Sequence, residues 1–255
     1  MPDARQTPMA SIFDLHVHTT KGSSDSSLSP EELVREAKRI GLTGVCLTEH
    51  SGWTDRHDFE RFARQHDIVL VRALEIDTDY GHILVFGLDG YIPGVTRVRD
   101  LRKVVRAMGG FMVSAHPFRN LFNPPPYNHN LIYKDPRCYP KTPREACEHM
   151  LFELVDAIEV VNGANTDQEN RFALEVARRL GKPGTGGSDA HSTHGLGKGV
   201  TLFDGPIRNE KDLIEALRAG ACRPAEGFHV GNLRIFGEEV GEMGAFGREL
   251  GQPDL

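Results

Sequence analysis

Two histidines separated by one residue end a short apolar stretch near the N-terminus, in Phe13-Asp-Leu-His-Val-His18. Side chains alternate between the two faces of a β-strand, so His16 and His18 would share one face. Leu15 and Val17 would share the opposite face. Neutral imidazole is the commonest metal-binding side chain in proteins. The pair therefore predicts a metal site, provided that other segments supply further ligands.

Further potential ligands follow four other short apolar runs, each of which predicts a strand. Residues 44–48, 68–74, 111–114 and 183–188 are followed by His50, by Glu75, by His116, and by Asp189 with His191. The C-terminal ends of parallel strands meet at one edge of a barrel, so these side chains are expected to converge there. Imidazoles and carboxylates crowded together would repel and desolvate one another without cations. Mixed nitrogen and oxygen donors suit Zn, Mn or Fe.

The elements that must position these residues alternate along the chain. Helices are expected over residues 30–40, 58–66, 98–108, 142–155, 166–180 and 209–220, and further strands over 157–161 and 199–203. Residues 82–86 predict an extra strand that forms a hairpin with 68–74, and the Pro-rich segment 118–141 is irregular. Strand-helix units repeated in this way are typical of a parallel barrel. We therefore expect an α/β fold, a distorted (β/α)7 barrel with the metal site at the C-terminal ends of its strands.

Composition limits the class of protein. The chain has 255 residues and a net charge of −6, so one domain is expected, without an extended basic surface for nucleic acid. No apolar stretch has the length of a membrane span or of a signal peptide, which predicts a cytoplasmic protein that does not bind membranes. The four cysteines are far apart and predict reduced thiols rather than disulfides.

As an ordered set, the ligand motifs resemble the polymerase and histidinol phosphatase (PHP) family of metal-dependent phosphoesterases. The matching segments are Asp14-Leu-His-Val-His-Thr19, Leu47-Thr-Glu-His50, Ala73-Leu-Glu-Ile76, His116-Pro117 and Gly187-Ser-Asp-Ala-His191. The resemblance covers residues 11–225 and leaves 226–255 as an unassigned C-terminal extension. It implies a distorted seven-stranded barrel. The sequence departs from the family at Glu49, where the family usually has Asp.

The resemblance also implies how two or three divalent ions would be held. One ion would be bound by His16, His18, Glu75 and Asp189, a second by Glu75 and His116, and a third by Asp25, His50 and His191. The remaining ligand of the second ion is left open between Glu159 and Asn162. Asp14 is expected to orient one of the ligand histidines from behind.

Clustered metal ions lower the pKa of a bridging water and clamp the oxygens of a phosphate. The sequence therefore predicts hydrolysis of phosphate esters by metal-hydroxide attack at phosphorus, with Glu75 and His194 as catalytic residues. His82, Arg119 and Arg171 are expected to bind the substrate, although a half-buried histidine and two surface arginines are the ordinary alternatives. The expected substrate is a small phosphomonoester, a nucleotide or an oligonucleotide end.

Other functions share the same residues. Histidinol-phosphate hydrolysis would use the same metal ligands. Amide hydrolysis of the amidohydrolase type shares the first His-x-His pair, but it commonly needs a bridging lysine that no motif here supplies. A non-catalytic, metal-binding regulatory module is the alternative outside enzymology, and loss of ligands would favour it. The sequence leaves the oligomeric state open.

Overall fold

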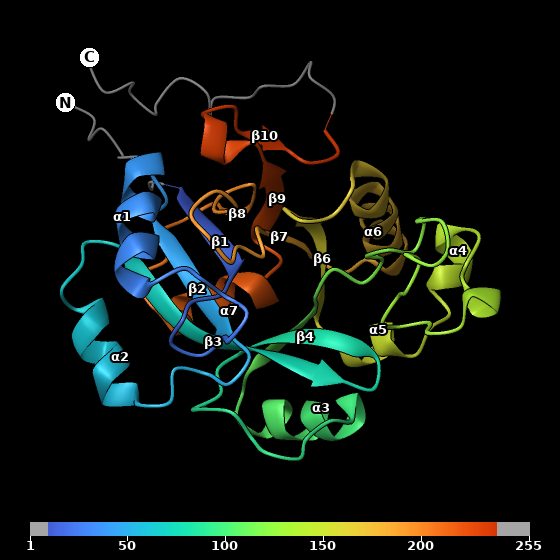
Figure 1. Cartoon of the computed structure of the whole chain (residues 1–255), viewed down its shortest axis with the longest axis horizontal. Helices are drawn as coiled ribbons and strands as arrows, with labels where there is room; N and C mark the ends of the chain where they lie inside the picture. The colour runs from blue at the N-terminus through green and yellow to red at the C-terminus, as the bar shows by residue number, and fades with distance from the viewer. Residues whose placement is uncertain (1–9, 239–255) are drawn as a thin grey trace, which may run out of the picture.

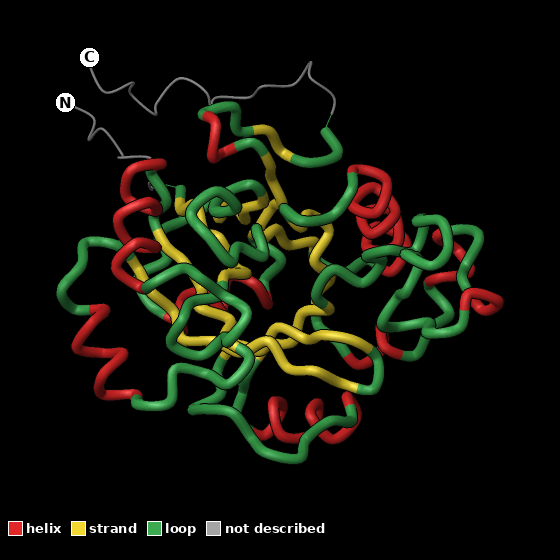
Figure 2. Tube along the Cα trace, in the orientation of Figure 1, coloured by secondary structure: helices red, strands yellow, loops and turns green. Residues whose placement is uncertain are grey.

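The computed structural model describes residues 10–238, whose strands form a single curled sheet (Figures 1 and 2). The order of strands across the sheet is β10-β9-β8-β1-β2-β3-β4-β5-β6-β7. The strands are β1 (Ser11–Val17), β2 (Gly44–Glu49), β3 (Val69–Thr78), β4 (Gly81–Phe86), β5 (Phe111–Ser114), β6 (Ala157–Asn162), β7 (Gly184–Gly187), β8 (Gly199–Phe203), β9 (Cys222–Glu226) and β10 (Arg234–Ile235). The N-terminal strand thus lies in the middle of the sheet.

Helices surround the sheet, and Figure 1 shows α1 and α2 on one side and α4 and α6 on the other. They are α1 (Pro30–Ile40), α2 (Arg56–Ala63), α3 (Val98–Ala107), α4 (Pro143–Ala146), α5 (Leu151–Leu154), α6 (Asp167–Leu180) and α7 (Glu210–Arg218). Leu213 and Leu217 of α7 belong to the same buried cluster as Phe13, Phe86 and Phe111. Helix α7 therefore contributes apolar side chains to the core on that face of the sheet.

The mixed α/β class is as expected, but the strand directions depart from a parallel barrel of seven. Strands β1, β2 and β3 pair in parallel, as do β5, β6 and β7. The expected hairpin is confirmed, because β4 runs antiparallel to both β3 and β5. Strand β8, expected as the seventh parallel strand, runs antiparallel to β1. The short β7–β8 connection contains no helix that could carry the chain back for parallel pairing.

The segment that follows β7, at one edge of the sheet, lies beside the end of β1. Val17 forms an isolated parallel bridge with Ala190. The backbone N–H of His18 donates to the carbonyl of Ala190 at 3.0 Å, and the N–H of Asp189 donates to the carbonyl of His16 at 2.7 Å. These bonds fix the segment that carries Asp189 and His191 directly beside the first His-x-His pair.

A β-bulge in β1 changes which side chains share a face. The register between β1 and β2 shifts between Asp14 and Val17. Leu15 consequently packs in one buried cluster and Val17 in another, so the expectation that they share a face is wrong. His16 and His18 still lie together, since a bulge re-aims the side chains around it.

Two helix boundaries also differ from expectation. Helix α2 begins at Arg56 because the Asp55 side chain accepts hydrogen bonds from the first N–H groups of the helix. The single helix expected over 142–155 is divided into α4 and α5. Between them, the N–H of Leu151 donates to Nδ1 of the His149 side chain at 3.2 Å. This N–H is therefore bonded to a side chain, and not to a backbone carbonyl as in a continuous helix.

The long irregular segment 118–141 is confirmed, and its only regular element among the described residues is the 3₁₀ turn η1 (Pro136–Cys138). Asn130, which is 1% exposed, holds the segment in place. Its amide donates to the carbonyls of Pro117 and Arg119, and its oxygen accepts from the N–H groups of Ile132 and Tyr133. The segment is thus fixed against the end of β5.

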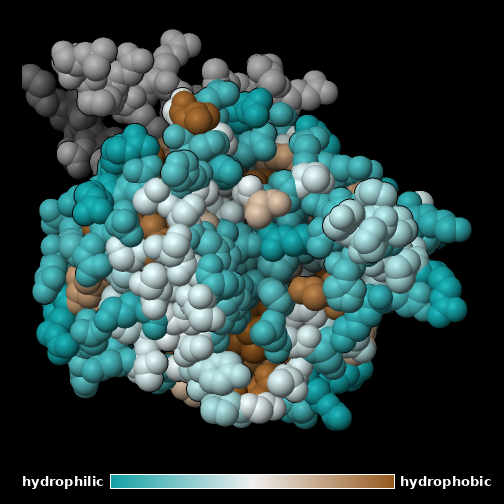
Figure 3. Space-filling model, viewed as in Figure 1, coloured by the Kyte–Doolittle hydropathy of each residue, from teal (hydrophilic) through white to brown (hydrophobic). Residues whose placement is uncertain are grey.

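The C-terminal part contains two strands that the sequence pattern did not reveal, β9 and β10, with the 3₁₀ turn η2 (Phe228–Val230) between them. Residues 226–238 therefore complete the edge of the sheet, and 239–255 lie outside the described residues. Across residues 10–238, none of the helices combines the length and the apolar character needed to cross a membrane. The face seen in Figure 3 is mainly hydrophilic, with hydrophobic residues in small separate patches.

Candidate metal centre

His16, His18, Glu75 and Asp189 form the most buried group of candidate ligands. The Nε2 atoms of His16 and His18 lie 3.1 Å apart. The Glu75 carboxylate lies 3.3 Å from Nε2 of His16 and 3.2 Å from Nε2 of His18. Oδ1 of Asp189 lies 3.4 and 3.3 Å from the same two nitrogens. Four metal-ligating side chains therefore converge on one point, as the sequence predicts.

A second group contains Glu75, His82 and His116. Oε1 of Glu75 lies 2.9 Å from Nδ1 of His82 and 3.0 Å from Nε2 of His116. His82 thus joins Glu75 and His116, at the group for which the sequence left the remaining ligand open between Glu159 and Asn162. Its predicted role in substrate binding stays a prediction. Nε2 of His82 lies 2.7 Å from the exposed carboxylate of Asp77, which would orient the ring.

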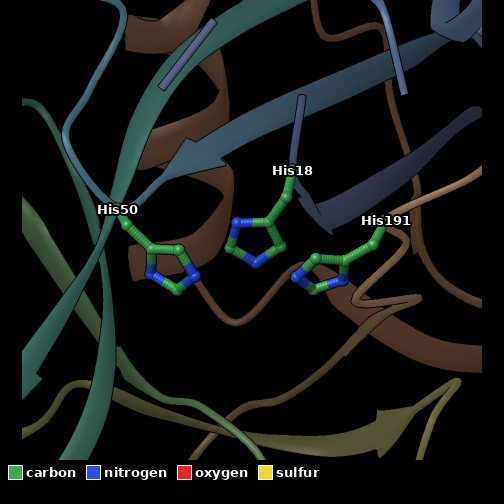
Figure 4. Close-up of side chains that lie close together, drawn as sticks. All are labelled: His18, His50 and His191. Carbon is green, nitrogen blue, oxygen red and sulfur yellow. The ribbon is translucent and has the colours of Figure 1, made fainter. Parts of the chain in front are cut away.

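A third group contains His18, His50 and His191, whose rings lie side by side in Figure 4 although they come from three separate segments. The ring centroids of His50 and His191 lie 4.6 and 4.5 Å from that of His18. Oδ2 of Asp25 lies 3.3 Å from Nε2 of His50 and 3.2 Å from Nε2 of His191. The loop between β1 and α1 thus brings Asp25 to this group.

In three of the histidines, Nδ1 lies within hydrogen-bonding distance of a neighbouring group. Nδ1 of His16 lies 2.9 Å from Oε1 of Glu159, and Nδ1 of His191 lies 3.0 Å from the carbonyl of Asp189. Nδ1 of His18 lies 3.1 Å from Oγ of Ser23. A partner of this kind fixes the ring and leaves the other nitrogen free to bind a metal. The sequence analysis did not single out Ser23, because serines are common in loops.

Asp14 acts differently from the expectation, because none of its hydrogen bonds reaches an imidazole. Its carboxylate accepts from the backbone N–H groups of His16, Ser188 and Gly197. Burial raises the pKa of this carboxyl to about 6. Asp14 therefore joins the backbones of two ligand-bearing segments instead of orienting a ring.

The charges of the centre are strongly coupled. Burial alone would raise the pKa of Glu75, but the imidazoles of His16, His116 and His18 hold it well below the ordinary value. Burial would lower the pKa of His16, but the carboxylates of Asp189, Glu159 and Glu75 hold it well above that value. The carboxylates and imidazoles of the centre thus favour the charged forms of one another. A donor set of imidazoles and carboxylates fits divalent metal ions.

The other expected site residues fall in different places. Arg119 reaches the centre, where one terminal nitrogen donates to Asp189 at 2.6 Å and to Asn162 at 2.7 Å. Its Nε donates to Asn165 at 2.9 Å. Arg171 pairs instead with Asp167 on the surface of α6 and lies over the ring of Phe236. Arg171 thus forms a surface ion pair, and its predicted contact with substrate stays a prediction.

His194, expected as a catalytic residue, is exposed. It lies close enough to Glu36 of α1 to help lower the pKa of that carboxyl, after the larger effect of Arg39. It belongs to none of the three ligand groups. Its predicted catalytic role stays a prediction.

The curled mixed sheet and a centre of histidines and carboxylates define the class of this protein as one built to hold metal ions. The sequence model described as PHP domain matches residues 14–150, and the model described as PHP-associated matches residues 167–222. Because the first match spans more than half of the chain, the protein belongs to the PHP domain family.

Individual relatives match shorter parts. An error-prone DNA polymerase of Nocardia farcinica is 35% identical over 69 residues, which are 27% of this chain and 6% of that protein. A 5'-3' exoribonuclease of Haemophilus influenzae is 31% identical over 102 residues, 38% of this chain and 36% of that protein. The chain thus spans only a small part of the length of either relative.

The fold is also found in solved structures. A two-domain protein of Bacteroides vulgatus, described as containing a predicted PHP-like metal-dependent phosphoesterase, superimposes with a TM-score of 0.60. The two are 20% identical, and the match covers 88% of this chain and 66% of the other. This likeness establishes the shared fold.

Proposed function

We propose that this protein is a metal-dependent phosphoesterase that holds two or three divalent ions of Zn, Mn or Fe. The observation that carries the proposal is the position of Glu75 between all three ligand groups. Its Oε1 lies near His16, His82 and His116, and its Oε2 lies 3.2 Å from His18 and 3.5 Å from His50. A carboxylate in this position is suited to bridge neighbouring ions, and neighbouring ions are typical of phosphoester hydrolases.

When bound, the ions would supply an activated water and neutralise charge on the phosphate. The protein's own residues would orient the ester. Arg119 is held by three side chains and remains partly exposed, with 28% of its side chain accessible. A guanidinium fixed in this way can donate hydrogen bonds to phosphate oxygens without further ordering. We infer that Arg119 positions the phosphate beside the metal ligands.

The space next to the centre favours a small substrate. A cavity of about 180 Å³ is lined by His82, His116, Arg119, Asn130 and Leu131, among others. This is below the usual 300–1,000 Å³ of a pocket that encloses a whole small-molecule ligand. We propose that it receives the group attached to the phosphate in a small phosphomonoester, a nucleotide or an oligonucleotide end. The exoribonuclease relative supports the nucleic-acid member of this set.

We further propose that residues 11–225 form the phosphoesterase unit and that 226–255 are an extension of it. The two family matches, which lie between residues 14 and 222, support these limits. The strand β10 of the extension pairs with β9 at the edge of the sheet, and neither of its residues belongs to a ligand group.

The test is hydrolysis of phosphomonoesters, nucleotides, histidinol phosphate and short oligonucleotides, followed as phosphate release from the monoesters and as release of mononucleotides from the oligonucleotides. Metal-loaded wild type would be compared with Glu75→Ala and His191→Ala, and with Glu153→Ala as a control at an exposed carboxylate. We expect one substrate class to be hydrolysed by wild type and by the control, and by neither of the other variants. If the metal-loaded protein hydrolyses nothing on the panel, the proposed reaction is wrong. Hydrolysis of histidinol phosphate alone would select that alternative.

A further inference from the structure

Arg119 uses only part of its guanidinium to hold the side chain in place. Nη2 donates to Asn162 at 2.7 Å and to Asp189 at 2.6 Å, and Nε donates to Asn165 at 2.9 Å. These bonds occupy three of the five N–H groups of an arginine. The other two, on Nη1, have no hydrogen-bond partner within residues 10–238, and 28% of the side chain is exposed. Nη1 is thus the part of the guanidinium that can donate to a ligand.

The backbone that carries this side chain is also fixed. The N–H of Arg119 donates to the carbonyl of His116 at 3.1 Å. The carbonyl of Arg119 accepts from the Asn130 amide at 2.9 Å, and the N–H of the next residue, Asn120, donates to Oε1 of Glu169. The peptide group between Arg119 and Asn120 is therefore held at both ends. Asn120 has a left-handed φ of 63°, a value that persists where the surroundings enforce it.

Glu169 has two separate tasks at the start of α6. It is 3% exposed and closes a capping box, in which its Oε2 accepts from the N–H of Thr166 at 2.8 Å. A capping box needs one side-chain acceptor at this position, and glutamine supplies it as well as glutamate does. The helix therefore does not need the second oxygen of Glu169, which is the oxygen that holds Asn120.

The next residue of α6, Asn170, reaches Arg119 by a different route. It is 6% exposed, its Oδ1 accepts from the N–H of Asn162 at 3.2 Å, and its amide donates to the carbonyl of Asn162 at 3.2 Å. These two bonds fix the backbone of Asn162, whose side-chain oxygen accepts from Nη2 of Arg119. One turn of α6 thus fixes Arg119 both through its backbone and through its guanidinium.

We propose that Glu169 and Asn170 are positioning residues for Arg119, and that they hold its guanidinium so that Nη1 donates to the phosphate of the substrate. The inference rests on the proposed function, in which Arg119 binds that phosphate. Neither residue belongs to a ligand group, and both act through the asparagines that they bind. A long side chain that is already ordered loses less conformational entropy when its ligand binds. Loosening Arg119 should therefore weaken phosphate binding although no donor is removed.

Two variants loosen Arg119 by the two routes. Glu169→Gln has a single side-chain oxygen, so when this oxygen serves the capping box, the NH₂ group faces the N–H of Asn120 and two donors oppose each other. Asn170→Ala removes both bonds to the backbone of Asn162. Neither variant removes Arg119 itself or any of the candidate metal ligands.

The probe is inorganic phosphate, whose affinity for the zinc-loaded protein is measured by titration calorimetry together with the zinc content. We expect Glu169→Gln and Asn170→Ala each to weaken phosphate binding about 10-fold, which is a usual coupling within one hydrogen-bond network, with zinc content unchanged. The matched control is Glu32→Gln in the capping box of α1. Among the described residues, the Glu32 carboxylate accepts hydrogen bonds only from Ser29. Its phosphate affinity should equal that of wild type.

A double-mutant cycle separates positioning from a general structural effect. In an Arg119→Ala background, Glu169→Gln and Asn170→Ala should have little further effect on phosphate affinity, because the side chain that they position is absent. Equal losses in both backgrounds would overturn the inference, as would a zinc-loaded wild type that binds no phosphate. Coupling in phosphate affinity without hydrolysis of any ester would support the inference and refute the proposed reaction.

A spectroscopic readout reports on the guanidinium itself. The ¹⁵Nε–¹Hε signal of Arg119, identified by its absence in Arg119→Ala, should exchange slowly with water in wild type, since this N–H is bonded to Asn165. We expect faster exchange in Glu169→Gln and in Asn170→Ala. Exchange as slow as in wild type in both variants would mean that other contacts fix the guanidinium, and the inference would be wrong.

Discussion

His116 and Asp189 adopt left-handed backbone conformations, with φ of 28° and 56°. Such values are uncommon for residues other than glycine and persist only where the surroundings enforce them. Here the N–H of His116 donates to Glu159 at 2.7 Å, and that of Asp189 donates to the carbonyl of His16 at 2.7 Å. Both residues follow the end of a strand, so the unusual turns direct their side chains into the centre.

Arg119 gives a prediction at the scale of one residue. We expect Arg119→Ala to lower kcat/KM for the phosphate ester about 100-fold, because one fixed donor to the transition state is removed. Arg119→Lys should recover only part of the loss, since an ammonium cannot replace the planar guanidinium. The measurement is steady-state kinetics together with zinc content, because Arg119 also contacts Asp189.

The matched control for this prediction is Arg137→Ala, which removes an exposed arginine of the same loop whose partner is Asp135. Its kinetics should equal those of wild type. Equal losses in Arg119→Ala and in Arg137→Ala would indicate a general effect of loop charge, and would contradict a specific role for Arg119.

The sequence singled out the candidate ligands that follow parallel strands, but it did not group His82 with them. The rule that sites form at the C-terminal ends of strands excludes a residue that begins one. Because β4 runs antiparallel to β3, its first residues lie beside the end of β3, where Asp77 pairs with His82 in the register. Glu75 and His82 thus reach the same place from opposite strand directions. Only the hairpin geometry reveals this.

At the scale of elements, Asn130 fixes the irregular segment through four hydrogen bonds with the backbone. We expect Asn130→Ala to destabilise the segment by about 2 to 4 kcal/mol, because buried carbonyl and N–H groups lose their partners. Hydrogen exchange of residues 118–134 would report the loss. Asn130→Asp keeps the acceptor oxygens, so its rates of hydrogen exchange over these residues should rise less than those of Asn130→Ala. Unchanged exchange in the alanine variant would mean that other contacts hold the segment.

Helix α7 begins with Glu210, whose Oε1 accepts from the N–H of Gly87 at 2.9 Å. Burial raises the pKa of this carboxyl above its ordinary value, although the bond from Gly87 opposes the shift. The folded protein therefore binds this proton more tightly than the unfolded chain. The contribution of Glu210 to stability is then greatest below the unfolded pKa and falls as pH rises through the folded value.

Glu210→Gln, which cannot ionise, should accordingly gain stability relative to wild type as the pH is raised from 4 to 7. Urea unfolding of both proteins at several pH values measures this difference. A constant difference over that range would contradict the raised pKa.

The patterns of capping residues predicted helices such as α1 and α6 well. They carry no information on the burial of Glu210, because that burial depends on how α7 packs against the sheet.

At the scale of the whole molecule, the candidate ligands come from β1 to β4 and from the segments that follow β5 and β7, so the metal centre joins distant parts of the chain. Removal of the ions should therefore lower the stability of the whole fold. Zinc at 1,000 times its dissociation constant adds about 4 kcal/mol. For a chain of this size we expect a chelator to lower the melting temperature by about 10 °C. Calorimetry with and without chelator tests this, and His191→Ala should respond less. An equal response would place the stabilising ion elsewhere.

The alternation of strands and helices was sufficient to predict the α/β class. It was not sufficient to predict the direction of β8. Its residues Gly199–Phe203 are all buried and have the composition of a parallel strand. Its pairing with β1 depends on the absence of a helix in the preceding connection and on contacts distant in sequence, which a local pattern does not contain.

The position of β1 in the middle of the sheet has a consequence for synthesis. Its neighbours are β2, which follows soon after it, and β8, which begins at Gly199. The first ligand of the centre is His16 and the last is His191, so a nascent chain exposes the His-x-His pair long before the partners arrive. A ribosome must release nearly all of this unit before the pocket can close. Occupancy by metal would then distinguish a finished chain from a truncated one.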